Sequence, residues 1–351
     1  MTTTGFDPNA PASPDSGIFG LTDAVEDAAV VLVPVPFDAT TSYRRGAALG
    51  PVAILKASHQ VDLFDLDLGR IYEGGIALLE RAPDDEVRLN DWNARARELA
   101  APIIEAGGAF TPAAEAALDE IDAICGALNE QVESEVSALL SQGKLVGIIG
   151  GDHATPFGAI AAHAARFEGM GLLHIDAHAD LREAFEGFTW SHASIMFNAM
   201  ARLPNVSKLV QVGLRDFCEE EFERIQASDG RIEAHFDVAL ARELSKGTSW
   251  TALCERIVAR LPRDVYVSLD IDGLDPALCP NTGTPVPGGL SFNQLQRLLE
   301  VLVESGRRIV GFDLTEVAPS PDDEHGDEWD ANVGARALYK LIGWARQSQM
   351  K

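Results

Sequence analysis

The chain is 351 residues long and 46% hydrophobic, which is enough to bury the core of one large α/β domain or two smaller ones. Acidic residues outnumber basic ones by 54 to 28, which gives a formal net charge of -26. This charge argues against nucleic acid and anionic membrane surfaces as partners, and it favours a cationic substrate.

The cysteines and the N-terminus indicate the cellular compartment. The four cysteines lie far apart without a C-x-x-C pair, which argues against a thiolate zinc site and fits a reducing compartment. Residues 1–17 lack the basic and apolar regions of a signal peptide, and no apolar run approaches the roughly 20 residues that cross a bilayer. We expect a cytoplasmic protein with a flexible N-terminal segment, residues 1–28, and a single α/β domain, residues 29–351.

Short apolar runs rich in β-branched residues alternate with stretches of helical periodicity. The predicted strands are Ala29–Val35, Leu145–Gly150, Gly171–Ile175, Leu209–Gly213, Val265–Leu269 and Ile309–Leu314. The predicted helices include Ala113–Ser141, Pro156–Arg166, Ala193–Arg202, Phe292–Glu304 and Ala335–Ala345. Continuously apolar strands indicate burial on both faces, so we predict a three-layer α/β/α fold with a central, mostly parallel sheet. Ligands of such folds bind at the carboxyl ends of the strands.

Polar residues follow three of these predicted strands. The first group is Gly150–His153, in which two glycines permit a tight turn that brings His153 to the strand end. On its own, this pattern equally fits an ordinary strand-to-helix turn. The second group is Asp176, His178 and Asp180, which occupy alternate positions and so share one side of an extended chain. A solvated loop is the alternative for this second group.

The third group, Asp270 and Asp272, also occupies alternate positions, and the Gly- and Pro-rich segment 273–290 that follows is of the rigid kind that frames a site. Together the three groups supply His153, Asp176, His178, Asp180, Asp270 and Asp272. Buried carboxylates need cations, and the charge of these four balances two divalent ions. A site rich in oxygen and imidazole, without thiolate, suits Mn²⁺-like ions better than structural zinc.

These segments resemble the ureohydrolase family of arginases, agmatinases and related amidinohydrolases. Its GGDH, DAH-x-D and S-x-D-x-D-x-x-DP motifs stand at Gly150–His153, Asp176–Asp180 and Ser268–Pro276. Further matching stretches lie at Val35–Pro51, Thr282–Leu290 and Asp313–Pro319, and the resemblance covers about residues 30–345. It implies an arginase-like fold and, by resemblance alone, a homo-oligomer, either a trimer or a hexamer.

The resemblance also implies two Mn²⁺ ions per subunit, with Ni²⁺ or Co²⁺ as alternatives. His153 and Asp180 would bind one ion, His178 and Asp272 would bind the other, and Asp176 and Asp270 would bridge them. A water activated between the ions would attack the guanidinium carbon of the substrate and release urea and an amine.

Three residues receive catalytic roles from the resemblance. Asp180 would pass a proton to the leaving amine, Glu316 would hold the guanidinium by charge-assisted hydrogen bonds, and His192 would shuttle protons. From the residues alone, Glu316 also fits a surface carboxylate after a strand. His192 also fits a histidine at a helix start that Ser191 caps.

The substrate is less firmly indicated, because the segment 181–190 departs from the arginase pattern and does not match agmatinase closely. Arg182 could bind a substrate carboxylate, or it could pair with Glu183 or Glu186. The acidic run 322–328 favours a cationic or neutral tail. We predict a small cationic guanidino substrate, with agmatine, hydrolysed to urea and putrescine, as first choice.

Several alternatives remain open at this point. Within the fold they are an arginase, a guanidino-acid or guanidine hydrolase, and a formimidoylglutamase. Outside that chemistry they are a non-catalytic metal-binding family member and a related deacetylase with one zinc ion.

Overall fold

The computed structural model describes residues 6–108, 111–320 and 329–350. The acidic run 322–328, which contributed to the substrate prediction, lies outside the described residues. No described helix combines the length and apolar character that crossing a membrane requires.

Eight strands form one central sheet in the order β4-β1-β5-β10-β9-β6-β7-β8, and every neighbouring pair is parallel. The strands are β1 Val30–Val35, β4 Ile76–Leu78, β5 Leu145–Gly150, β6 Gly171–Ile175, β7 Lys208–Leu214, β8 Ile232–Phe236, β9 Asp264–Asp270 and β10 Arg308–Thr315. A separate antiparallel hairpin joins β2 Phe64–Asp65 to β3 Gly69–Arg70. Because the central strands are parallel, their carboxyl ends meet at one edge of the sheet.

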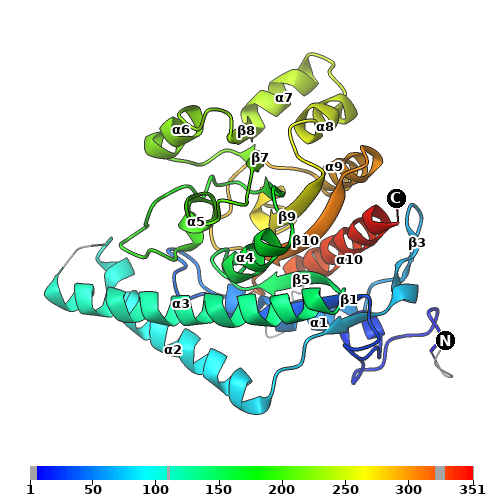
Figure 1. The fold of residues 1–351 in the computed structure, drawn as a ribbon, viewed down its shortest axis with the longest axis horizontal. Coiled ribbons are helices and arrows are strands. Elements are labelled where there is room, and N and C mark those ends of the chain that lie inside the picture. The colour runs from blue at the N-terminus through cyan, green and yellow to red at the C-terminus, as the bar shows by residue number, and fades with distance from the viewer. Residues whose placement is uncertain (1–5, 109–110, 321–328, 351) are drawn as a thin grey trace.

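Helices cover both faces of this sheet (Figure 1). They are α1 Gly50–Ser58, α2 Pro83–Glu105, α3 Pro112–Ser141, α4 Phe157–Arg166, α5 Ile195–Arg202, α6 Glu219–Gln226, α7 Asp237–Ser245, α8 Trp250–Val258, α9 Phe292–Glu304 and α10 Trp329–Gln349. Helices α1 and α7 to α10 contribute to the core on one face, and α2 to α6 contribute to the cores on the other. The long helix α3 packs against α2 and α4. The predicted α/β/α architecture is confirmed.

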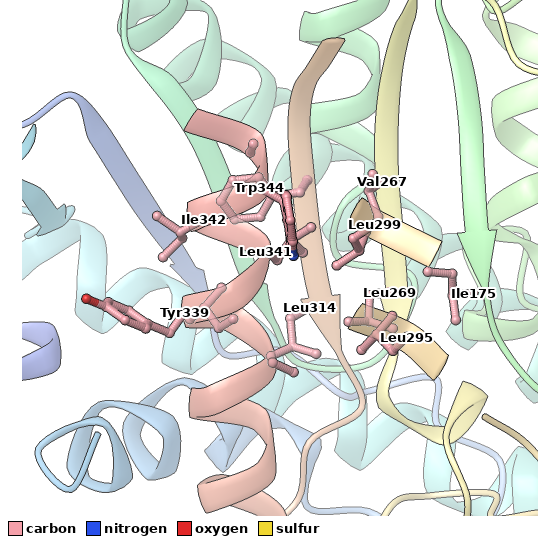
Figure 2. Packing of buried hydrophobic residues seen from close by; sticks show 14 of the residues in the cluster. Ile175, Val267, Leu269, Leu295, Leu299, Leu314, Tyr339, Leu341, Ile342 and Trp344 are labelled. Carbon is pink, nitrogen blue, oxygen red and sulfur yellow. The ribbon is translucent and has the colours of Figure 1, made fainter. Parts of the chain in front are cut away.

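Alternating burial explains why the strand sequences are continuously apolar. Val30 and Leu32 of β1 pack on one face, whereas Val31 and Val33 pack on the other, and all four are fully buried. Figure 2 shows the first of these cores, where Leu341 of α10 and residues of α9 lie beside β10 and β9. Each such side chain contributes about 1.5–3 kcal/mol through burial, which holds the strand ends in place.

Part of the N-terminal segment packs on this scaffold. Ile18 and Phe19 lie in a short 3-10 turn, Ile18–Gly20, and both side chains are buried. The backbone N–H of Phe19 donates to the Ser58 hydroxyl over 2.8 Å. These contacts attach residues 18–20 to the end of helix α1.

Candidate active site

The six predicted metal ligands converge at the carboxyl ends of neighbouring strands in the middle of the sheet. His153 follows β5, Asp270 ends β9, and Asp176 follows β6. Strand β10 lies between β5 and β9, and Glu316 comes directly after it. The sheet order therefore gathers side chains that are up to 163 positions apart in the sequence.

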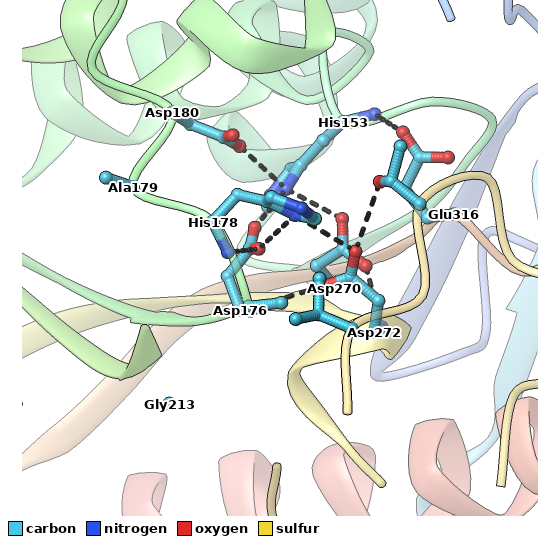
Figure 3. A network of polar contacts seen from close by, with 12 residues as sticks. His153, Asp176, His178, Ala179, Asp180, Gly213, Asp270, Asp272 and Glu316 are labelled. Atoms are coloured by element: carbon cyan, nitrogen blue, oxygen red, sulfur yellow. Dashed lines mark hydrogen bonds and ion pairs between the residues drawn. The ribbon is translucent and has the colours of Figure 1, made fainter. Parts of the chain in front are cut away.

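His153 lies at the centre of the first cluster (Figure 3). Its Nδ1 atom is 2.9 Å from Asp176 Oδ2, 3.2 Å from Asp180 Oδ2 and 3.1 Å from Asp270 Oδ2. The ring is buried, and Nδ1 makes no hydrogen bond of acceptable geometry within the described chain. An unpaired nitrogen that faces three carboxylate oxygens is the donor arrangement that a cation requires.

A second cluster shares Asp176 with the first. The Nδ1 atom of His178 is 3.1 Å from Asp272 Oδ2 and 3.4 Å from Asp176 Oδ1. Asp176 thus directs Oδ2 towards His153 and Oδ1 towards His178, as a carboxylate that bridges two ions would do. Backbone N–H groups hold these acids, since His178 N donates to Asp176 Oδ1 over 2.6 Å and Ala177 N donates to Asp272 Oδ1 over 3.0 Å.

The electrostatics show that the metal-free cluster would hold protons. Burial and the charges of Asp272 and Asp176 raise the pKa of Asp270 well above its usual range. Burial lowers the pKa of His153, but the three carboxylates close to Nδ1 outweigh that effect and raise it well above normal. Divalent cations would replace these protons. The donor set of oxygens and imidazoles, with no thiolate, is able to bind metal.

Two site residues adopt a backbone conformation that is rare outside glycine. Asp180 has φ 53° and Glu316 has φ 60°. Such left-handed residues cost of order 1–3 kcal/mol each and concentrate at functional sites. The sequence placed Asp180 in the cluster by strand alternation. In the structure β6 already ends at Ile175, and Asp180 reaches the cluster from a left-handed backbone conformation.

Glu316 and His192 lie together beside the cluster. Oε1 of Glu316 accepts from the backbone N–H of His153 over 2.9 Å and lies 3.5 Å from His192 Nδ1. Oε2 is buried and has no hydrogen-bond partner in the described chain. Burial lowers the pKa of His192, but the hydrogen bond and charge of Glu316 outweigh it and raise this pKa. Ser191 does cap the following turn, accepting from Ala193 N over 3.2 Å, while His192 still faces Glu316.

A cavity of about 170 Å³ opens over His153, His178, Asp180, His192 and Asp270. Arg182, Phe185, Asp216 and Glu221 also line it. The Arg182 Nε atom is 3.8 Å from Glu221 Oε2, and its guanidinium lies 4.7 Å from the centre of the Phe185 ring. Glu221 is therefore the acidic partner of Arg182, rather than either of the two residues considered from the sequence. A larger cavity of about 610 Å³, between residues 6–20 and 59–63, shares no lining residue with this one.

Sequence reasoning missed several buried polar residues around the cluster. Asp152 accepts from Thr40 Oγ1 over 3.0 Å, and burial together with the Glu316 charge raises its pKa to about 7. Asp313 and Gln211 are fully buried as well, and so is His174, for which the sequence indicated a supporting or core position one step inside the ligands. Of these, Gln211 carried a usable signal, because it is a lone polar side chain inside an apolar run.

Comparison with known proteins agrees with this geometry. The arginase family profile matches residues 28–343. The chain belongs to the arginase family.

Named relatives cover nearly the whole of this arginase-family chain. The N(1)-aminopropylagmatine ureohydrolase of Thermus thermophilus is 34% identical over 93% of this chain and 94% of its own length. The N(1)-aminopropylagmatine ureohydrolase of Synechocystis sp. is 31% identical over 93% of this chain and 92% of its own length. The agmatinase of Halalkalibacterium halodurans is 30% identical over 91% and 93%. The predicted enzyme class, a hydrolase of C–N bonds in linear amidines, is confirmed.

Solved structures show the same architecture. The agmatine ureohydrolase of Thermoplasma volcanium superposes with a TM-score of 0.69 at 25% identity, over 93% of both chains. The arginase of Medicago truncatula has a TM-score of 0.68 at 23% identity, over 91% of this chain and 88% of its own, and it supports the fold alone.

Proposed function

We propose that this arginase-family enzyme uses two divalent metal ions to hydrolyse a cationic guanidino compound of the agmatine class to urea and an amine. Agmatine and N(1)-aminopropylagmatine are the two substrates we favour. The observation that carries the proposal is the pair of carboxylate–imidazole clusters that share Asp176, next to the buried, unpaired oxygen of Glu316.

The proposed metal ligands are those of the two clusters. His153, Asp176, Asp180 and Asp270 would hold one ion, and Asp176, His178, Asp270 and Asp272 the other. When bound, the ions would lower the pKa of a water molecule towards neutrality and so supply the nucleophile. We propose Mn²⁺ as the resident ion, while Ni²⁺ or Co²⁺ would compete according to availability.

The protein groups around this site have separate tasks. Oε2 of Glu316 is free to accept two hydrogen bonds from a guanidinium, which also neutralises the buried charge. Asp180 would donate a proton to the leaving nitrogen, and burial, which raises its pKa, favours that protonated form. His192 lies between Glu316 and the cavity, and Ser42 Oγ is 3.1 Å from its Nε2 atom, so it can exchange protons with the cavity.

The cavity favours a cationic tail. The Arg182 Nε atom lies 3.8 Å from Oε2 of the buried Glu221, so a substrate carboxylate placed at Arg182 would also meet this acid. Asp216 is exposed in the cavity and would attract an amine. The names of the relatives point in the same direction, since agmatine is arginine without its carboxylate and its aminopropyl derivative carries a further amine.

A substrate panel on metal-reconstituted protein tests this proposal. Urea release should be measured with agmatine, N(1)-aminopropylagmatine, arginine, guanidinobutyrate and guanidine. We expect kcat/KM for one of the first two to exceed that for arginine by at least about tenfold. A clear preference for arginine or for guanidinobutyrate would contradict the agmatine-class assignment, and it would make Arg182 the contact for a substrate carboxylate.

Two further properties are proposed from the resemblance and the sequence. We propose that the chain assembles into a homo-oligomer, a trimer or a hexamer, which light scattering of the purified protein would measure. We also propose a cytoplasmic location, and fractionation of the producing cells would test it.

A further inference from the structure

A row of four buried polar residues crosses the sheet just below the proposed metal site. Gln211 of β7 pairs in register with His174 of β6, His174 pairs with Ser268 of β9, and Ser268 pairs with Asp313 of β10. All four side chains are fully buried. His174 and Ser268 each precede a proposed metal ligand by two positions, so the row supports the ligands from beneath.

The hydrogen bonds of Gln211 determine which way its amide points. Its side-chain nitrogen lies 2.7 Å from the carbonyl oxygen of Ala179 and 2.9 Å from His174 Nδ1. A carbonyl oxygen can only accept, so the group that faces Ala179 must be the NH₂. Its second hydrogen then points at His174 Nδ1, which must present a lone pair.

The proton of a neutral His174 ring is therefore on Nε2. That nitrogen lies 2.8 Å from Asp176 Oδ2, to which it donates. His174 is grouped with His153, Asp176 and Asp180 by distance alone, with its Nε2 atom 3.9 Å from Asp180 Oδ2. A nitrogen that carries a proton has no lone pair for a metal ion.

The other half of the row gives His153 the opposite arrangement. The Ser268 hydroxyl donates to Asp313 Oδ1 over 3.0 Å, and the same oxygen accepts from Leu269 N over 3.2 Å. A serine hydroxyl has one hydrogen, so its contact with His153 Nε2 at 2.9 Å uses the serine oxygen as acceptor. His153 Nε2 therefore carries a proton, so Nδ1 is the ring nitrogen left for a metal ion once the cluster gives up its own protons.

We propose that the row formed by Gln211, His174, Ser268 and Asp313 sets the ring nitrogen that each histidine presents to the metal site. It makes His153 a ligand through Nδ1, and it makes His174 a positioning residue that donates to the shared carboxylate of Asp176. The inference rests on the proposed metal site. Partners of this kind, which orient ligands, typically change metal affinity about 10- to 100-fold when removed.

Metal stoichiometry distinguishes a ligand from a positioning residue. Matched variants, His153→Asn and His174→Asn, would be loaded with Mn²⁺, dialysed and measured by elemental analysis and calorimetric titration. We expect His153→Asn to lose one of the two ions. We expect His174→Asn to keep both with about 10- to 100-fold weaker binding. Loss of one ion from His174→Asn, with both retained in His153→Asn, would overturn the proposal.

The tautomer itself is measurable in metal-free protein labelled with ¹⁵N-histidine. Long-range ¹H–¹⁵N spectra should show His174 with a proton on Nε2 and a bare Nδ1, its signals assigned by their loss in His174→Asn. In Gln211→Leu no donor faces His174 Nδ1, so the proton should no longer be fixed on Nε2 and should move to Nδ1 in part. An unchanged Nε2–H pattern in that variant would refute the role of Gln211.

A control for general loss of a buried hydrogen bond is available at the opposite end of the sheet. Ser348 is buried and accepts from Ile309 N over 3.0 Å, at the start of β10. Ser348→Ala should leave both the ion count and the His174 signals unchanged. Neither readout needs activity, so a protein with two ions and the expected tautomer but no urea release would refute only the proposed function. An active enzyme that uses His174 as a ligand would refute only the role of the row.

Discussion

Replacing Glu316 with glutamine should abolish most activity without weakening the fold. The carboxylate has one oxygen bound to His153 N and one buried oxygen without a partner in the described chain. A structural carboxylate would have both oxygens paired, because an unpaired buried acceptor lowers the free energy of unfolding. We therefore expect the free oxygen to be retained for the substrate.

The size of the effect follows from the bonds that are lost. Glutamine keeps the acceptor for His153 N and removes the negative charge that would hold the guanidinium. Hydrogen bonds to charged groups contribute roughly 1.5–3 kcal/mol each, so two of them amount to about 3–6 kcal/mol. At about 1.4 kcal/mol per tenfold, kcat/KM should fall about 10²- to 10⁴-fold.

The assay is steady-state urea release from agmatine, together with elemental analysis and urea-induced unfolding of the same preparations. The metal content should stay the same, and the free energy of unfolding should not decrease, because the substitution removes a charge that raises the pKa of buried Asp152. Glu183→Gln, on the exposed chain beside the cavity, is the matched control and should keep wild-type kcat/KM. Activity of Glu316→Gln within about threefold of wild type, or activity lost only in step with metal, would refute the reasoning.

Three further predictions concern stability. Removing the metal with a chelator should lower the free energy of unfolding. Adding Mn²⁺ back at about 100 times its dissociation constant should restore roughly 2.7 kcal/mol per ion. A melting temperature that does not change when the chelator is added would contradict this. Burial lowers the pKa of His163 to about 4, so the unfolded chain takes up the proton first as pH falls. Between pH 6.5 and 4, the free energy of unfolding of the wild type should thus fall by about 3 kcal/mol more than that of His163→Gln. Urea unfolding at several pH values measures this, and an equal pH dependence for the two proteins would show that His163 is not kept neutral by burial. A Cβ at Gly151 would lie 1.9 Å from the Phe37 carbonyl oxygen, so Gly151→Ala should destabilise the protein by about 1–3 kcal/mol or more. Gly126 on helix α3 faces open space, so Gly126→Ala should stabilise the protein by about 1 kcal/mol. Equal melting temperatures of the two variants would argue against the close contact between Gly151 and Phe37.

The strands that were predictable are those buried on both faces. Their apolar runs stand out from the surroundings, and the six predicted strands match β1, β5, β6, β7, β9 and β10 to within about one residue. The two strands of the central sheet that were missed lie at its edges, β4 and β8. Ile76–Leu78 is too short to show a period, and Ile232–Phe236 carries Glu and His on a half-exposed strand. Edge strands lack the double burial that makes a sequence continuously apolar.

The convergence of the six residues was predictable in outline because the carboxyl ends of parallel strands lie along one edge of the sheet. The contacts between the six residues were not, since they depend on strand register and on backbone conformations that leave no local pattern. Arg182 shows this, because its acidic neighbour is Glu221 on helix α6, and not Glu183 or Glu186, which are close to it in sequence. Asp180 shows it too, since its left-handed backbone is not encoded by any glycine.

No lysine or arginine of the described chain neutralises the acids of the proposed metal site, and this links metal binding to the stability of the fold. In the part of the chain that the structure describes, the charged partners of Asp176, Asp180, Asp270 and Asp272 are histidines, with no lysine or arginine within ion-pair distance. Arg215 approaches closely, but its guanidinium is occupied by backbone carbonyls, including that of Asp272 at 2.6 Å. A buried group of four acids whose nearby charge partners in the described chain are histidines alone costs several kcal/mol in the metal-free fold. The surrounding apolar core must offset that cost until external ions arrive, so the affinity for metal and the instability of the empty site have the same origin.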